Sequence, residues 1–275
     1  MTLIDTEHRL TQVTSKTTAL TVCCWGSAGS GKSTLAANLA FELAATGLRV
    51  ALIDADTYHP SQSALLGITE PGPGLTACLR LAVQGRFDEV ELERLSQVIE
   101  FDRHQIWYIP GLNSIARWPE VDAAALDSLT ESLHPHFEVV IWDIASYLET
   151  GVMDIESGSL RNQAALHLIA TSELALATFC ADPVGVNRFL FDIGAAGRDL
   201  WPIANRVRSS VLGRSATSQV AKTLREVAKV ELFGAVEEDS GIDEMLRTTR
   251  PLILQGKSKA RAEVQRIASR IAASC

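Results

Sequence analysis

One eight-residue segment near the amino terminus constrains the fold of this chain more than any other feature. It runs from Gly26 to Ser33 and matches the pattern G-x-x-x-x-G-K-[ST] at every fixed position. An apolar run, 20–25, precedes it, and leucines spaced four residues apart follow it from Leu35 to Leu43. A buried strand, a tight glycine turn and a helix are therefore expected in that order.

This arrangement is typical of a loop that binds phosphate groups. Glycines let backbone N–H groups turn inward around phosphate oxygens, and a helix that starts near Lys32 directs its free N–H groups at the same anion. Lys32 is then expected to contact the β- and γ-phosphates, while the Ser33 hydroxyl ligates Mg²⁺. The sequence predicts a nucleoside triphosphate, ATP with Mg²⁺, held by Gly26, Ser27, Ala28, Gly29, Ser30, Gly31, Lys32 and Ser33.

Three aspartates follow two apolar runs that are predicted to be buried strands. Asp143 ends the run 137–142, where a carboxylate beside the phosphate loop can hold Mg²⁺ through water. Asp54 and Asp56 end the run 50–53, and alternate strand residues share a face. Both carboxylates are therefore expected to point toward the γ-phosphate and its attacking water. The alternative for Asp56 is a structural role in capping a helix or forming a turn.

Strand and helix patterns alternate along the rest of the chain, which predicts a three-layer α/β/α sandwich around a mainly parallel sheet. The segment 57–105 reads as mostly helical, broken by a Pro-Gly-Pro-Gly turn. We expect residues 1–17 to be a flexible segment and 18–275 to form a single domain. The further strands are predicted at 106–109, 137–142, 174–180, 203–204 and 232–236, and helices at 119–133, 184–199, 217–229 and 259–272.

Charge and hydropathy exclude some classes of protein. The net charge of −8 argues against a generally basic nucleic-acid binder, although the segment 198–230 carries seven basic against two acidic residues. That segment is either a solvated helical face or a contact surface for an anion or an acidic partner. The chain has no apolar run long enough to cross a bilayer and no secretory signal, and its five cysteines match no zinc pattern. A cytoplasmic protein is expected.

The order and spacing of these motifs resemble the MinD/ParA family of P-loop ATPases, of the SIMIBI class, over about residues 18–272. The resemblance lies in the phosphate loop, in 52–56, in 139–143 and in 204–206. The segments 181–185 and 205–208 look most like the CpaE/TadZ kind of MinD-like protein.

The resemblance implies a role for each matching residue. Lys32, Ser33 and Thr34 would hold phosphates and metal, and Asp56 would position or activate the hydrolytic water. Asp54 and Asp143 would support Mg²⁺ through its water shell. Asn205 would meet the adenine edge, and Arg208 stands where GTPases place the aspartate that reads guanine, which favours ATP over GTP.

One position departs from the family pattern. The family usually places a lysine second in the loop, and that lysine reaches across a dimer to the partner's nucleotide. Here the position is Ser27, which cannot deliver a charge across an interface. Nucleotide binding is still expected, because the glycines and Lys32 remain, but ATP-driven dimerisation and fast hydrolysis do not follow from this sequence.

Our leading hypothesis is therefore an ATP-binding switch with weak ATPase activity that positions or regulates a cell-envelope machine, in pilus assembly or septum placement. It would act as a homodimer with protein partners and order 144–161 on binding ATP. The alternatives are a non-hydrolysing scaffold, a small-molecule kinase and a partition-type ATPase that binds DNA through 198–230. The helix 259–272 is amphipathic, and we interpret it as the closing helix of the domain, so that any membrane association is indirect.

Overall fold

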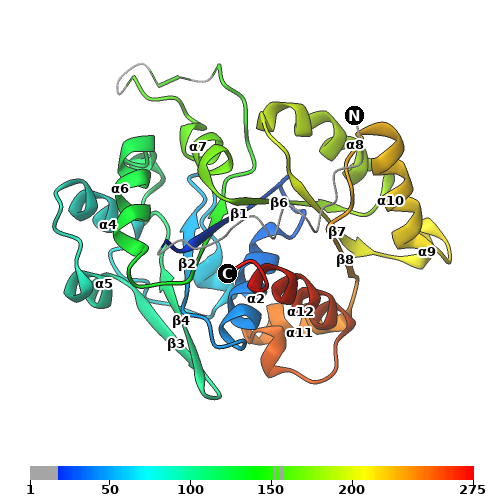
Figure 1. Cartoon of the computed structure of the whole chain (residues 1–275), viewed down its shortest axis with the longest axis horizontal. Helices are drawn as coiled ribbons and strands as arrows, with labels where there is room; N and C mark the ends of the chain where they lie inside the picture. The colour runs from blue at the N-terminus through cyan, green and yellow to red at the C-terminus, as the bar shows by residue number, and fades with distance from the viewer. Residues whose placement is uncertain (1–17, 152, 155–157) are drawn as a thin grey trace.

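Eight strands form one sheet at the centre of the computed structural model, which describes residues 18–151, 153–154 and 158–275 (Figure 1). They lie side by side in the order β3-β4-β2-β5-β1-β6-β7-β8. The strands are β1 Leu20–Gly26, β2 Val50–Ala55, β3 Gln97–Phe101, β4 His104–Ile109, β5 Val139–Ile144, β6 Leu174–Cys180, β7 Trp201–Val207 and β8 Gly234–Glu237. All neighbours run parallel except β3 and β4, which form an antiparallel hairpin. The predicted mainly parallel sheet is confirmed, whereas the segment 1–17, predicted to be flexible, lies outside the described residues.

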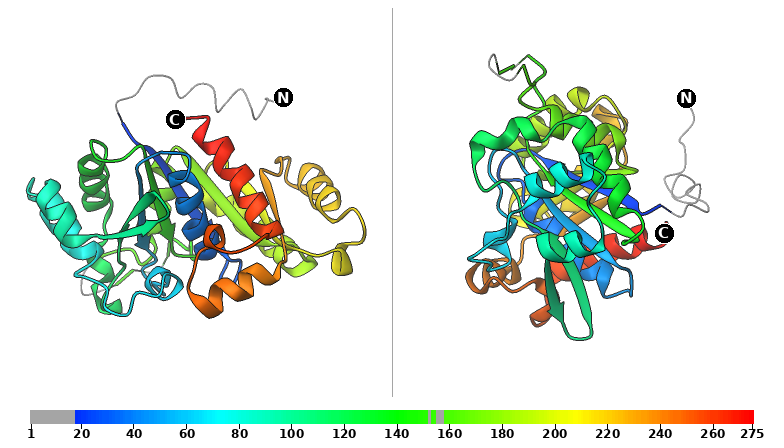
Figure 2. Two further views of the ribbon diagram at one scale, coloured as in Figure 1. Left: turned by 90° about the horizontal axis from the view of Figure 1, so that it is seen from below. Right: turned by 90° about the vertical axis from the view of Figure 1, so that its left-hand side faces the viewer.

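Side chains that alternate along the strands divide the core into two apolar layers. In β1, Val22 and Cys24 join one layer, and Cys23 and Trp25 join the other. The first layer packs against α2 Lys32–Ala44, α11 Ser240–Thr248, η3 Leu252–Leu254 and α12 Lys259–Ala272. The second packs against α4 Leu75–Val83, α5 Glu89–Leu95, α6 Ala123–Leu133, α7 Gln163–Thr171, α8 Pro183–Asp192 and α10 Ala216–Val227. Figure 2 shows helices on both faces of the sheet, the three layers that the alternating pattern predicts.

The last helix, α12, closes the first layer as predicted. Val264, Ile267 and Ile271 are buried beside α2, and the Arg261 guanidinium donates to the Glu42 carboxylate at 2.8 Å. Its apolar stripe is thus used inside the domain. In the part of the chain that the structure describes, every helix is too short or too polar to span a membrane.

One predicted element is wrong. The segment 57–105 was expected to be mostly helical, and it does contain α3 Gln62–Leu65, α4 and α5, but its end forms strand β3 and the start of β4. Ile99 and Phe101 turn toward the first layer while Val98 and Glu100 are exposed, a period of two that pairing with β4 enforces. Helices α7 and α11 were not predicted.

One carboxylate holds the starts of two helices that close the first layer. Asp239 caps α11 by accepting from the Gly241 N–H at 2.6 Å, and its other oxygen accepts from Lys259 N–H, the first residue of α12, at 2.5 Å. Replacing Asp239 by alanine should lower the free energy of unfolding by about 2 kcal/mol, because two helix starts each lose a side-chain acceptor. Urea denaturation measures this change in the free energy of unfolding. The matched control is Asp122→Ala, which removes the cap of one helix only, α6. Equal losses for the two variants would contradict the double cap.

Candidate nucleotide-binding site

The predicted phosphate loop lies at the carboxyl end of β1, between the ends of β5 and β6, and leads directly into α2. Gly29 and Gly31 adopt φ values of 79° and 91°, a backbone region that favours glycine. Gly26 is needed for a different reason, since a Cβ there would lie 2.2 Å from the Thr178 carbonyl oxygen on β6. These glycines therefore let the chain turn closely against the sheet, as the motif predicts.

The start of α2 is open to an anion. Gly31 stands at its N-cap position, no side chain in the described part of the chain caps the helix, and its first turn contains no acidic residue. Unpaired N–H groups and the positive end of the helix dipole therefore face the loop. This is the arrangement that binds phosphate groups.

Lys32 is buried at this point and lies between two carboxylates. Its Nζ donates to Asp56 Oδ2 at 2.8 Å and to Asp143 Oδ1 at 3.4 Å. Burial acts to lower the pKa of Lys32, but the charges of Asp143 and Asp56 outweigh it and raise that pKa above its usual value. Burial likewise acts to raise the pKa of Asp56, yet Lys32 lowers it. Lys32 is thus a cation that is paired within the protein.

The three predicted aspartates gather beside Lys32. Asp54 and Asp143 are register partners on the parallel strands β2 and β5, so both side chains face α2. Strand β5 continues to Ile144, so Asp143 lies inside the strand rather than at its end. Burial, with the charge of Asp143, raises the pKa of Asp54 to about 8. Carboxylates and the Ser33 hydroxyl are oxygen ligands of the kind that Mg²⁺ takes, directly or through water.

Asn205, predicted to meet adenine, contacts the phosphate loop itself. Its Nδ2 donates to the Ser30 carbonyl oxygen at 2.7 Å, and a Cβ on Gly31 would lie 2.2 Å from that nitrogen. The side chain also lines a pocket of about 270 Å³ that begins at Thr34 and continues to Glu237 and Ile242. Asn205 therefore joins the loop to a pocket that lies beside it.

The sequence did not predict two groups of contacts near the aspartates. Gln62, at the start of α3, is fully buried and donates to both Asp143 and the Ser33 carbonyl oxygen. The Arg161 guanidinium lies 3.6 Å from the Tyr58 ring centroid and donates to the Thr57 carbonyl oxygen at 2.9 Å. Nothing in local sequence marks either residue, because both act across the fold.

The basic segment 198–230 is largely engaged within the protein. Arg208, Lys222 and Arg225 each lie within 4 Å of a glutamate, at 3.5, 3.8 and 2.7 Å respectively. Arg198 donates to backbone carbonyl oxygens of Ile169 and Ser172. These pairings favour the solvated-face interpretation of this segment over a nucleic-acid surface.

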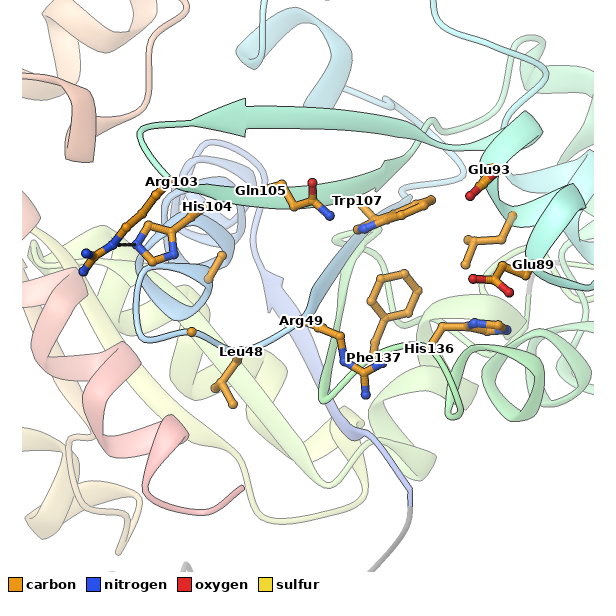
Figure 3. Close-up of a pocket in the computed structure, with 13 residues that line it drawn as sticks. Leu48, Arg49, Glu89, Glu93, Arg103, His104, Gln105, Trp107, His136 and Phe137 are labelled. Atoms are coloured by element: carbon orange, nitrogen blue, oxygen red, sulfur yellow. Dashed lines mark hydrogen bonds between the residues drawn. The ribbon is translucent and has the colours of Figure 1, made fainter.

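A second pocket, of about 350 Å³, lies at the opposite end of the sheet (Figure 3). Arg49 and His136 come from the chain just before β2 and β5, and His104 from the start of β4, with Trp107 and Phe137 between them. The phosphate loop follows the carboxyl end of β1, so this pocket is separate from the candidate site.

Comparison with known proteins agrees with the geometry of the loop. The sequence model of the CobQ/CobB/MinD/ParA nucleotide binding domain matches residues 22–252. An iron–sulfur cluster carrier protein of Synechocystis is 35% identical over 118 residues, 40% of this chain and 32% of the relative. The chain thus spans about a third of the length of the carrier proteins that it matches first. The septum site-determining protein MinD of Thermotoga maritima is 22% identical over 246 residues, 90% of this chain and 85% of the relative.

Solved structures share the fold. A ParA family ATPase from Chlorobium tepidum superposes with a TM-score of 0.75 at 13% identity, over 92% of this chain and 99% of that one. MinD from Pyrococcus horikoshii, complexed with Mg-ADP, gives a TM-score of 0.67 at 20% identity, over 92% and 95%. Since the family match covers most of the residues and includes the phosphate loop, the chain belongs to the MinD/ParA family of P-loop ATPases.

Proposed function

We propose that this protein is an ATP-binding switch with weak ATPase activity that regulates or positions a cell-envelope machine, as a CpaE/TadZ-like member of its family. The observation that carries the proposal is the buried Lys32, poised between Asp56 and Asp143 at the uncapped start of α2. A triphosphate there would take Lys32 from its carboxylate partners. Binding of ATP would therefore change the charges around Asp56.

The residues at the site fit ATP and Mg²⁺. The Ser30 Oγ and Thr178 Oγ1 atoms beside the loop are buried and have no hydrogen-bond partner among the described residues, so polar groups remain available to a ligand. The loop amides, Lys32, Ser33 and Thr34 would hold the phosphates. The pocket lined by Asn205 would take the base. Ser33 would hold magnesium directly, and Asp54 and Asp143 would support it through its water shell. The bound ion would offset the negative charge of the phosphate oxygens.

A chain of contacts connects Asp56 to the predicted switch segment 144–161. Asp56 Oδ1 accepts from the Tyr58 N–H at 2.9 Å, and the Tyr58 hydroxyl donates to Asn162 Oδ1 at 2.7 Å. Arg161 stacks on the same ring. Any shift of Asp56 would therefore reach the surface through Tyr58, which gives the switch a physical path. Of the predicted switch residues, Val152 and 155–157 lie outside the described residues.

Replacing Asp56 by asparagine tests the enzymatic part of the proposal. We expect kcat for ATP hydrolysis to fall about a hundredfold, as for removal of a group that positions or deprotonates the attacking water. The Kd for ADP should change by less than about threefold, since the loop and Lys32 remain. Steady-state phosphate release and calorimetric titration with ADP measure the two quantities.

The same measurements separate the switch enzyme from the scaffold alternative. Wild-type turnover no greater than that of Asp56→Asn, with intact ADP binding, would favour a non-hydrolysing scaffold that acts through protein contacts. Ser27 is the observation that favours this second candidate, because the loop has no lysine at that position. Absence of ADP binding in the wild type would exclude the switch enzyme and leave a scaffold that acts through protein contacts alone.

A further inference from the structure

Gln62 connects three parts of the candidate site through one side chain and one amide. Its Nε2 donates to the Ser33 carbonyl oxygen at 2.9 Å and to Asp143 Oδ2 at 2.8 Å. Its backbone N–H donates to Asp54 Oδ2 at 3.0 Å. The phosphate-loop helix and both predicted magnesium-supporting carboxylates are therefore held by a single residue, which is itself fully buried.

These contacts give the two aspartates different roles. Asp54 accepts from three backbone N–H groups, those of Ser61 and Gln62 at Oδ2 and that of Asp56 at Oδ1. It is thereby occupied in forming the turn after β2. Among the described residues, Asp143 accepts from side chains alone, Lys32 at Oδ1 and Gln62 at Oδ2. Asp143 can therefore change partners when Lys32 moves, while the hydrogen bond from Gln62 keeps the Asp143 carboxylate in its orientation.

The other end of the Gln62 amide has no partner. Its Oε1 is buried and accepts no hydrogen bond from the described residues. An unsatisfied buried acceptor costs about 1–3 kcal/mol, so such groups in folded proteins commonly meet water or a ligand. Water bound to Mg²⁺ is a strong donor, and the Nε2 end of the same amide contacts Asp143 and the Ser33 carbonyl oxygen, two of the residues beside which that ion is expected.

We propose that Gln62 is a positioning residue for magnesium: it orients Asp143 and offers Oε1 as an acceptor to metal-bound water. This inference rests on the proposed function, since it concerns the Mg²⁺ that accompanies the nucleotide. It predicts that Gln62 affects the magnesium-dependent part of nucleotide affinity and leaves the rest unchanged.

The test compares the Kd for ADP with excess Mg²⁺ and with EDTA in the wild type and in Gln62→Met, which fills a similar volume without polar atoms. We expect the Kd in EDTA divided by the Kd in Mg²⁺ to fall about tenfold in the variant, because the Kd in Mg²⁺ rises. This is the usual effect of losing an outer-shell partner of a metal. The Kd in EDTA should stay within about twofold, because the loop amides and Lys32 are unchanged. An unchanged ratio would overturn the proposal, and an equal rise of both Kd values would assign Gln62 a structural role only.

A second measurement uses the wild type and so does not depend on how the variant folds. In protein labelled with ¹⁵N, the Gln62 side-chain amide should shift when Mg²⁺ is added to the ADP complex, and absence of a shift would also overturn the proposal. Failure of the proposed function looks different. A wild type that does not bind ADP refutes nucleotide binding itself, and one that binds ADP equally in Mg²⁺ and EDTA refutes the metal.

Discussion

Replacing Lys32 by alanine should weaken ADP and ATP binding by about a hundredfold, because charge-assisted hydrogen bonds to phosphate contribute about 3 kcal/mol. The side chain is buried at the start of α2, where no other lysine or arginine contacts Asp56 or Asp143 among the described residues. The neighbouring loop amides remain, so weak binding of phosphate should persist. Calorimetric titration with ADP in Mg²⁺ measures the change.

The same substitution should also destabilise the empty protein. Lys32 is the cation that balances Asp56 and Asp143, whose side chains are 7% and 0% exposed. Removing one member of a buried ion pair leaves an uncompensated charge and costs about 3 kcal/mol. Urea denaturation of the nucleotide-free variant measures this loss. Lys222→Ala, which breaks an exposed pair with Glu226 on α10, is the control and should change stability little.

Two effects from one residue distinguish this site from a simple anion pocket. If Lys32→Ala lost ADP affinity without any loss of stability, the ion pairs with Asp56 and Asp143 would not exist in solution. If stability fell and ADP affinity did not, the loop would not hold phosphate through Lys32. Only the combined result agrees with a lysine that exchanges carboxylate partners for a nucleotide, which is the physical basis of the proposed switch.

Local sequence was sufficient for the loop and for placing the aspartates near the ends of two buried strands, although β5 continues one residue past Asp143. The apolar run 20–25, the glycines and the helix that follows are determined by neighbours in the chain, so their prediction needed no distant contact. The pairing of Asp54 with Asp143 in the sheet agrees with a further rule, that the carboxyl ends of parallel strands meet at one edge of a sheet. Trp25 and Trp142, the last residues of two apolar runs predicted to be buried strands, are buried.

Contacts between distant segments were not predictable in the same way. Gln62 looks like an ordinary polar residue in a loop, and only the fold places it against Asp143, 81 residues away. The resemblance predicted that Asn205 contacts the adenine base. Its contact with Ser30 was not predicted, because the two residues are 175 positions apart in the sequence. Strand β3 was missed because its pattern is five residues long and depends on its partner β4.

Replacing Ser27 by lysine should produce a protein that dimerises on binding ATP. Ser27 occupies the second position of the loop, and it is half-buried beside the exposed Ala28 and Gly29. A lysine there would lie next to the exposed part of the phosphate loop. The resemblance to the family implies that a lysine at this position contacts the nucleotide of a second protomer.

The expected gain is about tenfold or more in the dimer association constant, since one charge-assisted contact is worth about 1.5 kcal/mol or more across such an interface. Light scattering with ATP and Mg²⁺ measures the mass, in the background of Asp56→Asn so that ATP persists during the measurement. Ala28→Lys is the matched control, because it adds the same charge one residue further along.

Either outcome sharpens the interpretation of the loop. A dimer that forms only in Ser27→Lys would mean that the remaining interface residues are present and that Ser27 alone limits assembly. A wild type that already dimerises with ATP would mean that another cation replaces the missing lysine. A monomer in every case would contradict the family's dimer mechanism for this chain, and the switch would then act through the Tyr58 and Arg161 contacts within one protomer.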